Sequence, residues 1–216
     1  MWRGWRASRG EPTLPSVSAP EPGAVDDVVA YVERLGIPVS PALRERLGGF
    51  RPRRFARGEH FVRPGAVARA IAFVRSGKVQ HYYLVDGRER TRWVALPQNF
   101  TVAFKSFVQA SPSEAGLVCI EPTVLLVMPR AEFRALLEES DAMRRLWTAA
   151  LEAEMVRYED RVTQLITLDA RARYRRFVAD YPEHAREVPL KYIASMLGID
   201  PRHLSRLRAR PASGEK

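Results

Sequence analysis

Residues 188–210 carry the pattern that most constrains how this 216-residue chain can fold. They read VPLKYIASMLGIDPRHLSRLRAR, with two short apolar periodicities on either side of a glycine. The first periodicity predicts a helix that starts at Pro189 and ends before Gly198, because glycine readily takes the left-handed conformation of a helix cap. Asp200 and Pro201 then supply an N-cap and a first helical residue, so a second helix must begin there. The stretch predicts two helices that cross through a tight turn.

These two helices share an apolar inner side and leave a basic outer face. The inner positions hold Leu190, Ile193, Ala194, Leu197, Ile199, Leu204 and Leu207. Arg202 and Arg206 lie one turn apart, so both can enter a major groove, where a guanidinium matches the O6 and N7 acceptors of guanine. His203 is a third candidate for base contact. Candidates for phosphate contact lie at the margins of the pair: Lys191, Ser205, Arg208 and Arg210. The alternative is a helical hairpin in an ordinary core, but the turn chemistry favours a reader of double-stranded DNA.

The composition sets wider bounds. A net charge of +10 and an isoelectric point near 10.3 favour a polyanionic partner, although such a charge is also compatible with binding to a membrane surface or with simple solubility. Cys119 is the only cysteine, which excludes an intramolecular disulfide framework and any cysteine-only metal or iron–sulfur site. Residues 1–24 have no apolar core like that of a signal peptide, so we expect a disordered tail. No apolar run approaches the length of a membrane span, and we expect a cytoplasmic protein without a membrane partner.

Short segments separated by glycine-containing turns fill residues 50–96. The clearest hairpin crosses Asp86-Gly87, a pair that favours the primed turns matching strand twist. Regular short strands of this kind are typical of a barrel or jelly roll. The other elements expected before the last third of the chain are helices over 25–35, 41–47 and 129–138 and strands over 78–85, 89–96, 116–120 and 123–128.

A long helix is predicted over residues 141–168. Its apolar side chains are spaced by three and four residues, close to a coiled-coil seam: Trp147, Leu151, Met155, Tyr158, Val162 and Leu165. This stripe could pack on the strands of its own chain or on a second copy, and the heptad spacing favours the second copy. A further helix over residues 169–180 is expected to turn Tyr174, Phe177 and Val178 inward beneath the final helix pair.

The order of these elements, together with four sequence segments, resembles the Crp/Fnr family of bacterial transcription regulators. The segments are RGEHFVRPG (57–65), FVRSGKVQHYYLVDGRE (73–89), VLLVMPRAEF (124–133) and VPLKYIASMLGID (188–200). The resemblance implies an α+β fold: a jelly-roll-like, double-stranded β-roll sensor domain, a long dimerisation helix and a C-terminal helix-turn-helix domain. The implied boundaries are 1–24 for the tail, 25–139 for the β-roll, 140–168 for the dimerisation helix and 169–216 for the DNA-binding domain.

The resemblance also implies a homodimer on near-palindromic DNA, with an unidentified small-molecule effector and RNA polymerase as further partners. Cyclic-nucleotide-binding members have a Gly-Glu pair for the ribose and an Arg-Ser or Arg-Thr pair for the phosphate. Residues 98–117 lack the Gly-Glu pair and place Pro112 where the phosphate arginine is expected. Glu114 would repel an anion, whereas Lys105 and Ser113 supply a cation and a hydroxyl. We predict an effector pocket around these three side chains that does not respond to cyclic AMP.

Other chemistries can be weighed against the residues. Haem binding through His60 or His81 and redox sensing by Cys119 are less favoured than buried structural roles. A cupin-type metalloenzyme would gather several histidines and a carboxylate, but the strand region supplies only two histidines. A β-barrel that binds proteins or small ligands without binding DNA is a further alternative. The chain carries no Gly-rich phosphate loop, nucleophile elbow or paired-carboxylate motif, so we predict no catalytic residue, metal site or cofactor.

Overall fold

The computed structural model describes residues 23–209. The expected tail, residues 1–24, lies almost entirely outside this range, and so does Arg210. The described chain begins with two helices, α1 (Ala24–Arg34) and α2 (Pro41–Leu47), and continues into a region of short strands, as the turn residues predicted. The strands are β1 (Arg51–Phe55), β2 (His60–Val62), β3 (Ala70–Ser76), β4 (Val79–Val85), β5 (Arg88–Ala95), β6 (Asn99–Thr101), β7 (Ala115–Cys119) and β8 (Thr123–Pro129).

The strands form two antiparallel four-stranded sheets, in the orders β1-β8-β3-β6 and β2-β7-β4-β5. Their facing sides enclose a large hydrophobic core that includes Phe73, Leu117 and Leu126, each fully buried. Helices α1, α2 and α4 (Arg130–Glu139) and the start of α5 (Asp141–Thr167) cover one end of this core. The two sheets and their antiparallel order confirm the predicted β-roll.

The β4–β5 hairpin follows its predicted turn chemistry. Asp86 and Gly87 both have positive φ, 51° and 71°, which is the requirement of a type I′ turn. Past the turn, β5 pairs only with β4, so β5 is an edge strand of its sheet. Edge strands carry unpaired backbone groups, and proteins usually cover or protect them.

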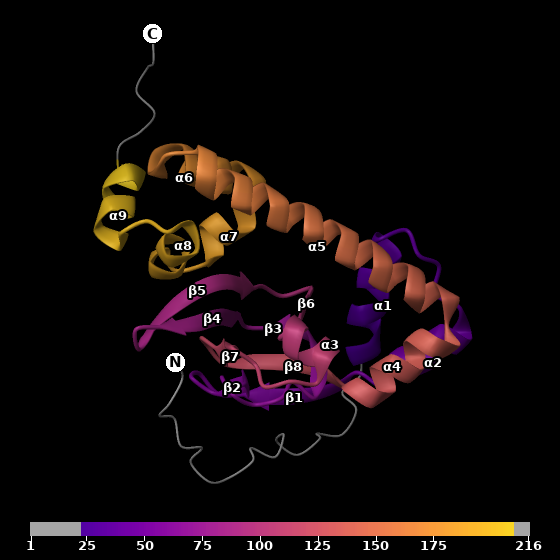
Figure 1. Ribbon diagram of the computed structural model, residues 1–216. Coiled ribbons are helices and arrows are strands. Elements are labelled where there is room, and N and C mark those ends of the chain that lie inside the picture. The colour runs from indigo at the N-terminus through magenta and orange to yellow at the C-terminus, as the bar shows by residue number, and fades with distance from the viewer. Residues whose placement is uncertain (1–22, 210–216) are drawn as a thin grey trace.

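The C-terminal helices lie over this edge (Figure 1). They are α6 (Ala170–Asp180), α7 (Pro182–Glu187), α8 (Leu190–Leu197) and α9 (Pro201–Ala209). A second hydrophobic core joins these helices to the strand region, because Val94 and Leu96 at the end of β5 cluster with Phe177, Ile193 and Leu204. The long helix α5 runs from the far end of the β-roll to this second core (Figure 1). Among the described residues, no helix is long and apolar enough to cross a membrane.

The structure corrects several local predictions. Val178 was expected to point inward but is 38% exposed, whereas Phe177 beside it is buried. The first helix of the final pair begins at Leu190, and Pro189 occupies its N-cap position in extended conformation. Helix α3 (Phe104–Gln109) and helix α7 were not predicted, because both are only six residues long and give no clear periodicity.

The glycine before β4 offers a test of the β-roll. Gly77 has φ +82°, and a Cβ there would lie 2.6 Å from the Pro122 carbonyl oxygen and 2.7 Å from the Thr123 Cα. We expect Gly77→Ala to destabilise the protein by about 3 kcal/mol in urea unfolding, because strain and backbone overlap add. Gly87→Ala is the control, since its φ is +71° but its Cβ would meet nothing within 4 Å, and it should cost only about 1 kcal/mol. Equal losses would contradict the overlap.

Candidate nucleic-acid interface

The turn between α8 and α9 has the predicted chemistry. Gly198 adopts the left-handed conformation at φ +63°, and the Ile199 amide donates to the Ala194 carbonyl at 2.9 Å. Asp200 then caps α9, because its Oδ1 accepts from the backbone amides of Arg202 at 2.9 Å and His203 at 3.1 Å. Ala194 of α8 and Leu204 of α9 are both fully buried and belong to the same hydrophobic cluster, so the two helices share one core.

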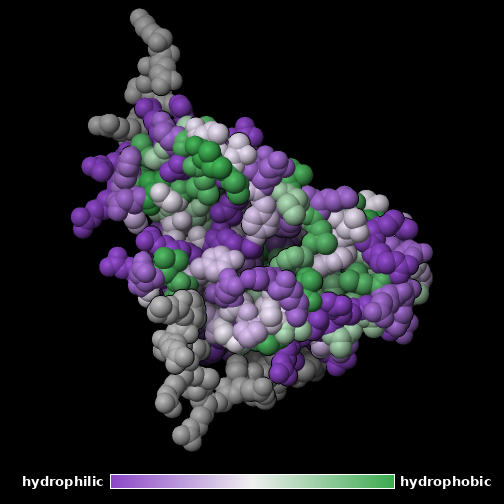
Figure 2. Space-filling model, in the orientation of Figure 1, coloured by the Kyte–Doolittle hydropathy of each residue, from purple (hydrophilic) through white to green (hydrophobic). Residues whose placement is uncertain are grey.

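The opposite side of α9 is polar, basic and open to solvent. Its exposed side chains are Arg202, His203, Ser205, Arg206 and Arg208. A concave surface at the start of the helix is lined by Asp200, Pro201, Arg202, Ser205 and Arg206. Within residues 23–209, none of the three α9 arginines has an ion-pair partner. Figure 2 shows hydrophilic side chains along the edge of the molecule where α9 lies. Lys191 is also exposed, on α8, with its ammonium 4.7 Å from the centre of the Tyr192 ring.

The backbone of β5 is covered by side chains from three helices. Thr91 N donates to Ser195 Oγ of α8 at 2.8 Å, and the Val94 carbonyl accepts from His184 Nε2 of α7 at 3.0 Å. Between them, the Arg92 carbonyl accepts from Arg161 Nη2 of α5 at 2.8 Å. We call these three contacts the β5 clamp. Together they satisfy backbone groups that an edge strand would otherwise leave open.

Aromatic rings reinforce the same junction. The Trp93 ring lies 4.4 Å from the His184 ring and 5.1 Å from the Tyr181 ring, measured between centroids. The Arg161 guanidinium lies 5.3 Å from the Trp93 centroid, within the range of a cation–π contact. Burial lowers the pKa of Arg161, and the nearby charge of Arg92 lowers it further. The guanidinium therefore depends on the ring and on carbonyl oxygens for its stabilisation.

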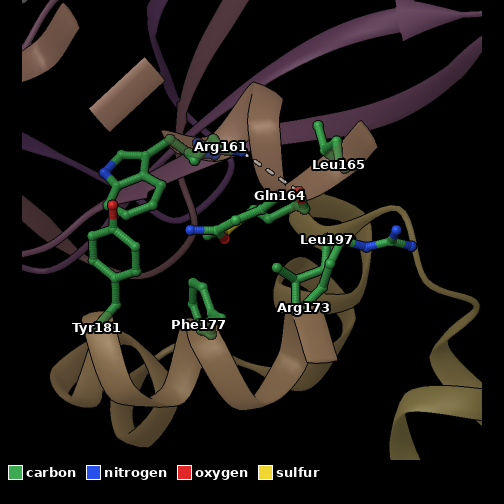
Figure 3. A pocket seen from close by; sticks show the side chains of 9 residues that line it. Arg161, Gln164, Leu165, Arg173, Phe177, Tyr181 and Leu197 are labelled. Atoms are coloured by element: carbon green, nitrogen blue, oxygen red, sulfur yellow. Dashed lines mark hydrogen bonds between the residues drawn. The ribbon is translucent and has the colours of Figure 1, made fainter. Parts of the chain in front are cut away.

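A small cavity lies where α5, α6 and α8 meet β5. Its volume is about 20 Å³, which is room for about one water molecule. Figure 3 shows Gln164 of α5 extending toward Phe177 of α6 and toward Tyr181 at the end of α6. Arg161 of α5 and Leu197 of α8 also line the cavity. This cavity is too small for an organic effector, so we assign it to the packing of the junction.

His184 is a titratable side chain within the junction. Burial lowers its pKa below 6.5, against the opposing effects of its bond to the Val94 carbonyl and the nearby Glu183 and Glu187 carboxylates. The Arg157 guanidinium on α5 lowers the pKa slightly further. A histidine with a lowered pKa stabilises the docked state when neutral, and that stability is lost as the pH falls below about 6.5.

We therefore expect the docked helices to loosen between neutral and mildly acidic pH. The measurement is the fluorescence of a variant in which Trp93 is the only tryptophan, followed from pH 7.5 to pH 5. A solvent-exposed, red-shifted emission should appear on acidification. The control is the same variant with His184→Gln, whose side-chain amide can still donate to Val94 but does not titrate. A shift of equal size in the control would assign the effect to another group.

The predicted effector-pocket residues do not form an open pocket. Lys105 Nζ and Glu114 Oε1 pair at 2.6 Å on the surface, with side chains 66% and 68% exposed. The hydrogen bond and charge of Glu114 raise the pKa of Lys105. Ser113 is buried, and its hydroxyl donates to the Ala115 carbonyl at 2.7 Å. The structure brings the three residues close together, but their polar groups bind one another or the adjacent backbone.

The other candidate sensor residues have structural surroundings. Cys119 is fully buried, and burial raises its pKa to about 11. His81 is also buried; burial lowers its pKa to about 3, and its Nε2 shares a 2.7 Å hydrogen bond with Thr101 Oγ1. His60 Nε2 lies 2.9 Å from the Tyr82 hydroxyl. Within the described part of the chain, no group of three or more histidine, cysteine, aspartate or glutamate residues could hold a metal ion.

The apolar stripe of α5 divides into two parts. Trp147 packs on its own chain, with its ring 5.2 Å from the Phe133 ring and 6.0 Å from the Phe104 ring, and Leu151 is half-buried. The rest of the predicted stripe is exposed: Met155, Tyr158, Val162 and Leu165. Ile166, which the predicted stripe left out, is 78% exposed beside it. This half of the stripe is largely open to solvent in the described chain, although the Arg92 guanidinium lies 5.1 Å from the centre of the Tyr158 ring and Leu165 lines the junction cavity.

With this geometry in place, comparison with known proteins identifies the class of the strand region. Residues 52–140 match the family model described as "Cyclic nucleotide-binding domain". The match spans the strand region and helix α4. No curated protein matches the chain.

Solved structures similar to the chain include FixK2 from Bradyrhizobium japonicum, with 18% identity and a TM-score of 0.64 over 76% of this chain and 88% of that chain. A CooA mutant from Carboxydothermus hydrogenoformans has 20% identity and a TM-score of 0.61, covering 74% of this chain and 75% of that chain. The c-di-GMP-responsive global regulator CLP from Xanthomonas campestris has 20% identity and a TM-score of 0.58, covering 73% and 84%. These neighbours are Crp/Fnr-type regulators, and the similarity confirms the predicted combination of an antiparallel β-roll with several helices.

Proposed function

We propose that this protein is a sequence-specific DNA-binding transcription regulator of the Crp/Fnr type and not an enzyme. The observation that carries the proposal is the exposed basic face of α9. Arg202 and Arg206 lie one turn apart on a helix held by a capped start and a buried Leu204, with α8 packed across it. This is the arrangement of a helix-turn-helix unit, in which the second helix enters the major groove. His203 is the third candidate for base contact, and Lys191, Ser205 and Arg208 are candidates for phosphate contact.

The protein acts in this proposal as a homodimer through α5. The uncovered stripe from Met155 to Leu165 has the three-and-four spacing of a coiled-coil seam, and a second copy would cover it. A two-fold axis along this seam would present two copies of α9 to DNA. The expected site is a near-palindrome with half-sites about one helical turn apart.

Regulation would come from an effector other than cyclic AMP. The Lys105–Glu114 pair leaves no free cation at that position for a cyclic phosphate, and Glu114 would repel the anion. A ligand bound elsewhere in the β-roll would reach α8 through β5, since β5 belongs to both hydrophobic cores. RNA polymerase is a further partner, and the cytoplasm is the expected compartment.

The test is selection of bound duplexes from a random DNA pool with the full chain at moderate salt, because non-specific binding depends strongly on salt. A near-palindromic motif is expected, and cyclic AMP should leave its affinity unchanged. A second selection, with a small-molecule cell extract added, would detect DNA binding that requires an effector. No enriched motif under either condition would refute DNA reading and favour an interaction or ligand-binding module.

A further inference from the structure

The β5 clamp joins one strand segment to three of the helices that follow it. Its three contacts come from three different helices and all fall within four consecutive residues, 91–94. They hold α5, α7 and α8 to one short piece of backbone. The α9 face stays exposed in this docked arrangement, so the clamp does not block the candidate DNA-reading residues.

The strand side of the clamp is itself held in place. Gln80 of β4 is only 3% exposed, and its Nε2 donates to Thr91 Oγ1 at 3.0 Å and to Glu89 Oε2 at 3.2 Å. These bonds position the strand segment whose amide meets Ser195. A buried amide with satisfied partners gives a rigid support, because any displacement leaves a polar group unpaired.

We propose that Ser195 and His184 are positioning residues, which fix the orientation of α9 relative to the β-roll so that both readers of a dimer meet their half-sites together. This inference rests on the proposed function. The two α9 helices of a dimer bind two half-sites of the same DNA. Once one α9 helix is bound, the binding of the other depends on how well the protein holds it over the second half-site. Loss of the clamp would leave each reader intact and reduce only their joint binding.

The test compares a full palindromic site with a site in which one half is scrambled. The variant is Ser195→Ala with His184→Phe, which removes two clamp bonds and keeps an aromatic ring beside Trp93. We expect its affinity for the full site to fall about tenfold while its affinity for the half-site stays within about twofold of wild type. The double variant should also show a smaller difference in affinity between the full site and a site whose half-sites are separated by one additional base pair. Thr163→Ala, a hydroxyl removal at an exposed position of α5, is the neutral control.

Two readouts separate this role from a general loss of structure. In a background where Trp93 is the only tryptophan, the double variant should show a red-shifted emission that reports greater solvent access at the clamp. Equal losses at the full site and the half-site would overturn the inference, because they would indicate damage to the reader itself. Full-site binding by the double variant that is unchanged or tighter than wild type would also overturn the inference. Tighter binding would indicate that the clamp inhibits DNA binding. Failure of the proposed function is distinguishable, since it would appear as absent sequence preference in the wild-type protein.

Discussion

Arg206→Ala is expected to weaken binding to the selected DNA site by about 1–3 kcal/mol, or roughly 5- to 150-fold, and to relax the base preference at one position in each half-site. The reason is the loss of a guanidinium that matches two acceptors on guanine. The side chain is exposed on α9 and has no ion-pair partner among residues 23–209, so its removal should leave folding unchanged. Fluorescence anisotropy with the selected site and with single-base variants of it measures both effects.

Arg208→Ala is the matched control for this prediction. Arg208 is also exposed and lies two residues further along the same helix, where we expect it to face a phosphate. Its removal should weaken binding to all sequences alike and reduce the slope of log affinity against log salt by about 1 for each phosphate that is no longer neutralised. If Arg206→Ala showed this same uniform pattern, Arg206 would bind phosphate and the predicted base reader would be wrong.

Val162→Asp is expected to convert the protein from a dimer to a monomer at micromolar concentration. Val162 is 53% exposed in the described chain and lies in the middle of the uncovered stripe of α5. A carboxylate in the centre of a helix seam loses its hydration and has no partner, at a cost of several kcal/mol for the pair of substitutions. Sedimentation velocity measures the change in mass, and full-site DNA affinity should fall with it.

Val156→Asp provides the control for the seam. Val156 is 59% exposed, similar to Val162, but it lies outside the three-and-four spacing of the stripe. The control should remain dimeric, since its carboxylate would stay in water. Dissociation of both variants would indicate a general effect of added charge, and retention of the dimer by Val162→Asp would refute the α5 seam.

The features that could be predicted from the sequence are those with local causes. Asp86-Gly87 and Gly198 each adopt positive φ, which produces a turn at that point of the chain. The sequence therefore predicts the position of the β4–β5 hairpin turn and of the turn between α8 and α9. The helix over 41–47 was also predicted, and the structure shows that the Ser40 hydroxyl caps its start by accepting from the Leu43 amide. The exposed arginines of α9 follow from helical periodicity alone.

The features that escaped prediction depend on distant partners. Ser195 and Thr91 are 104 residues apart, and nothing near either residue indicates that a side chain will meet a strand edge. The same holds for His184 and Val94, which are 90 residues apart. The ion pair between Lys105 and Glu114 was also missed, because it requires α3, which the sequence does not signal. Only the assembled fold brings these groups together.

The shared core at β5 also bears on how the chain folds during synthesis. Helices α6 to α9 complete their core with Val94 and Leu96, which emerge from the ribosome about one hundred residues earlier. The β-roll can therefore form first and present a finished surface to helices that follow. In a fragment that carries only the C-terminal helices, the side of this core that meets Val94 and Leu96 would be open to water. The candidate DNA-reading helices then acquire their final packing only after the β-roll has folded.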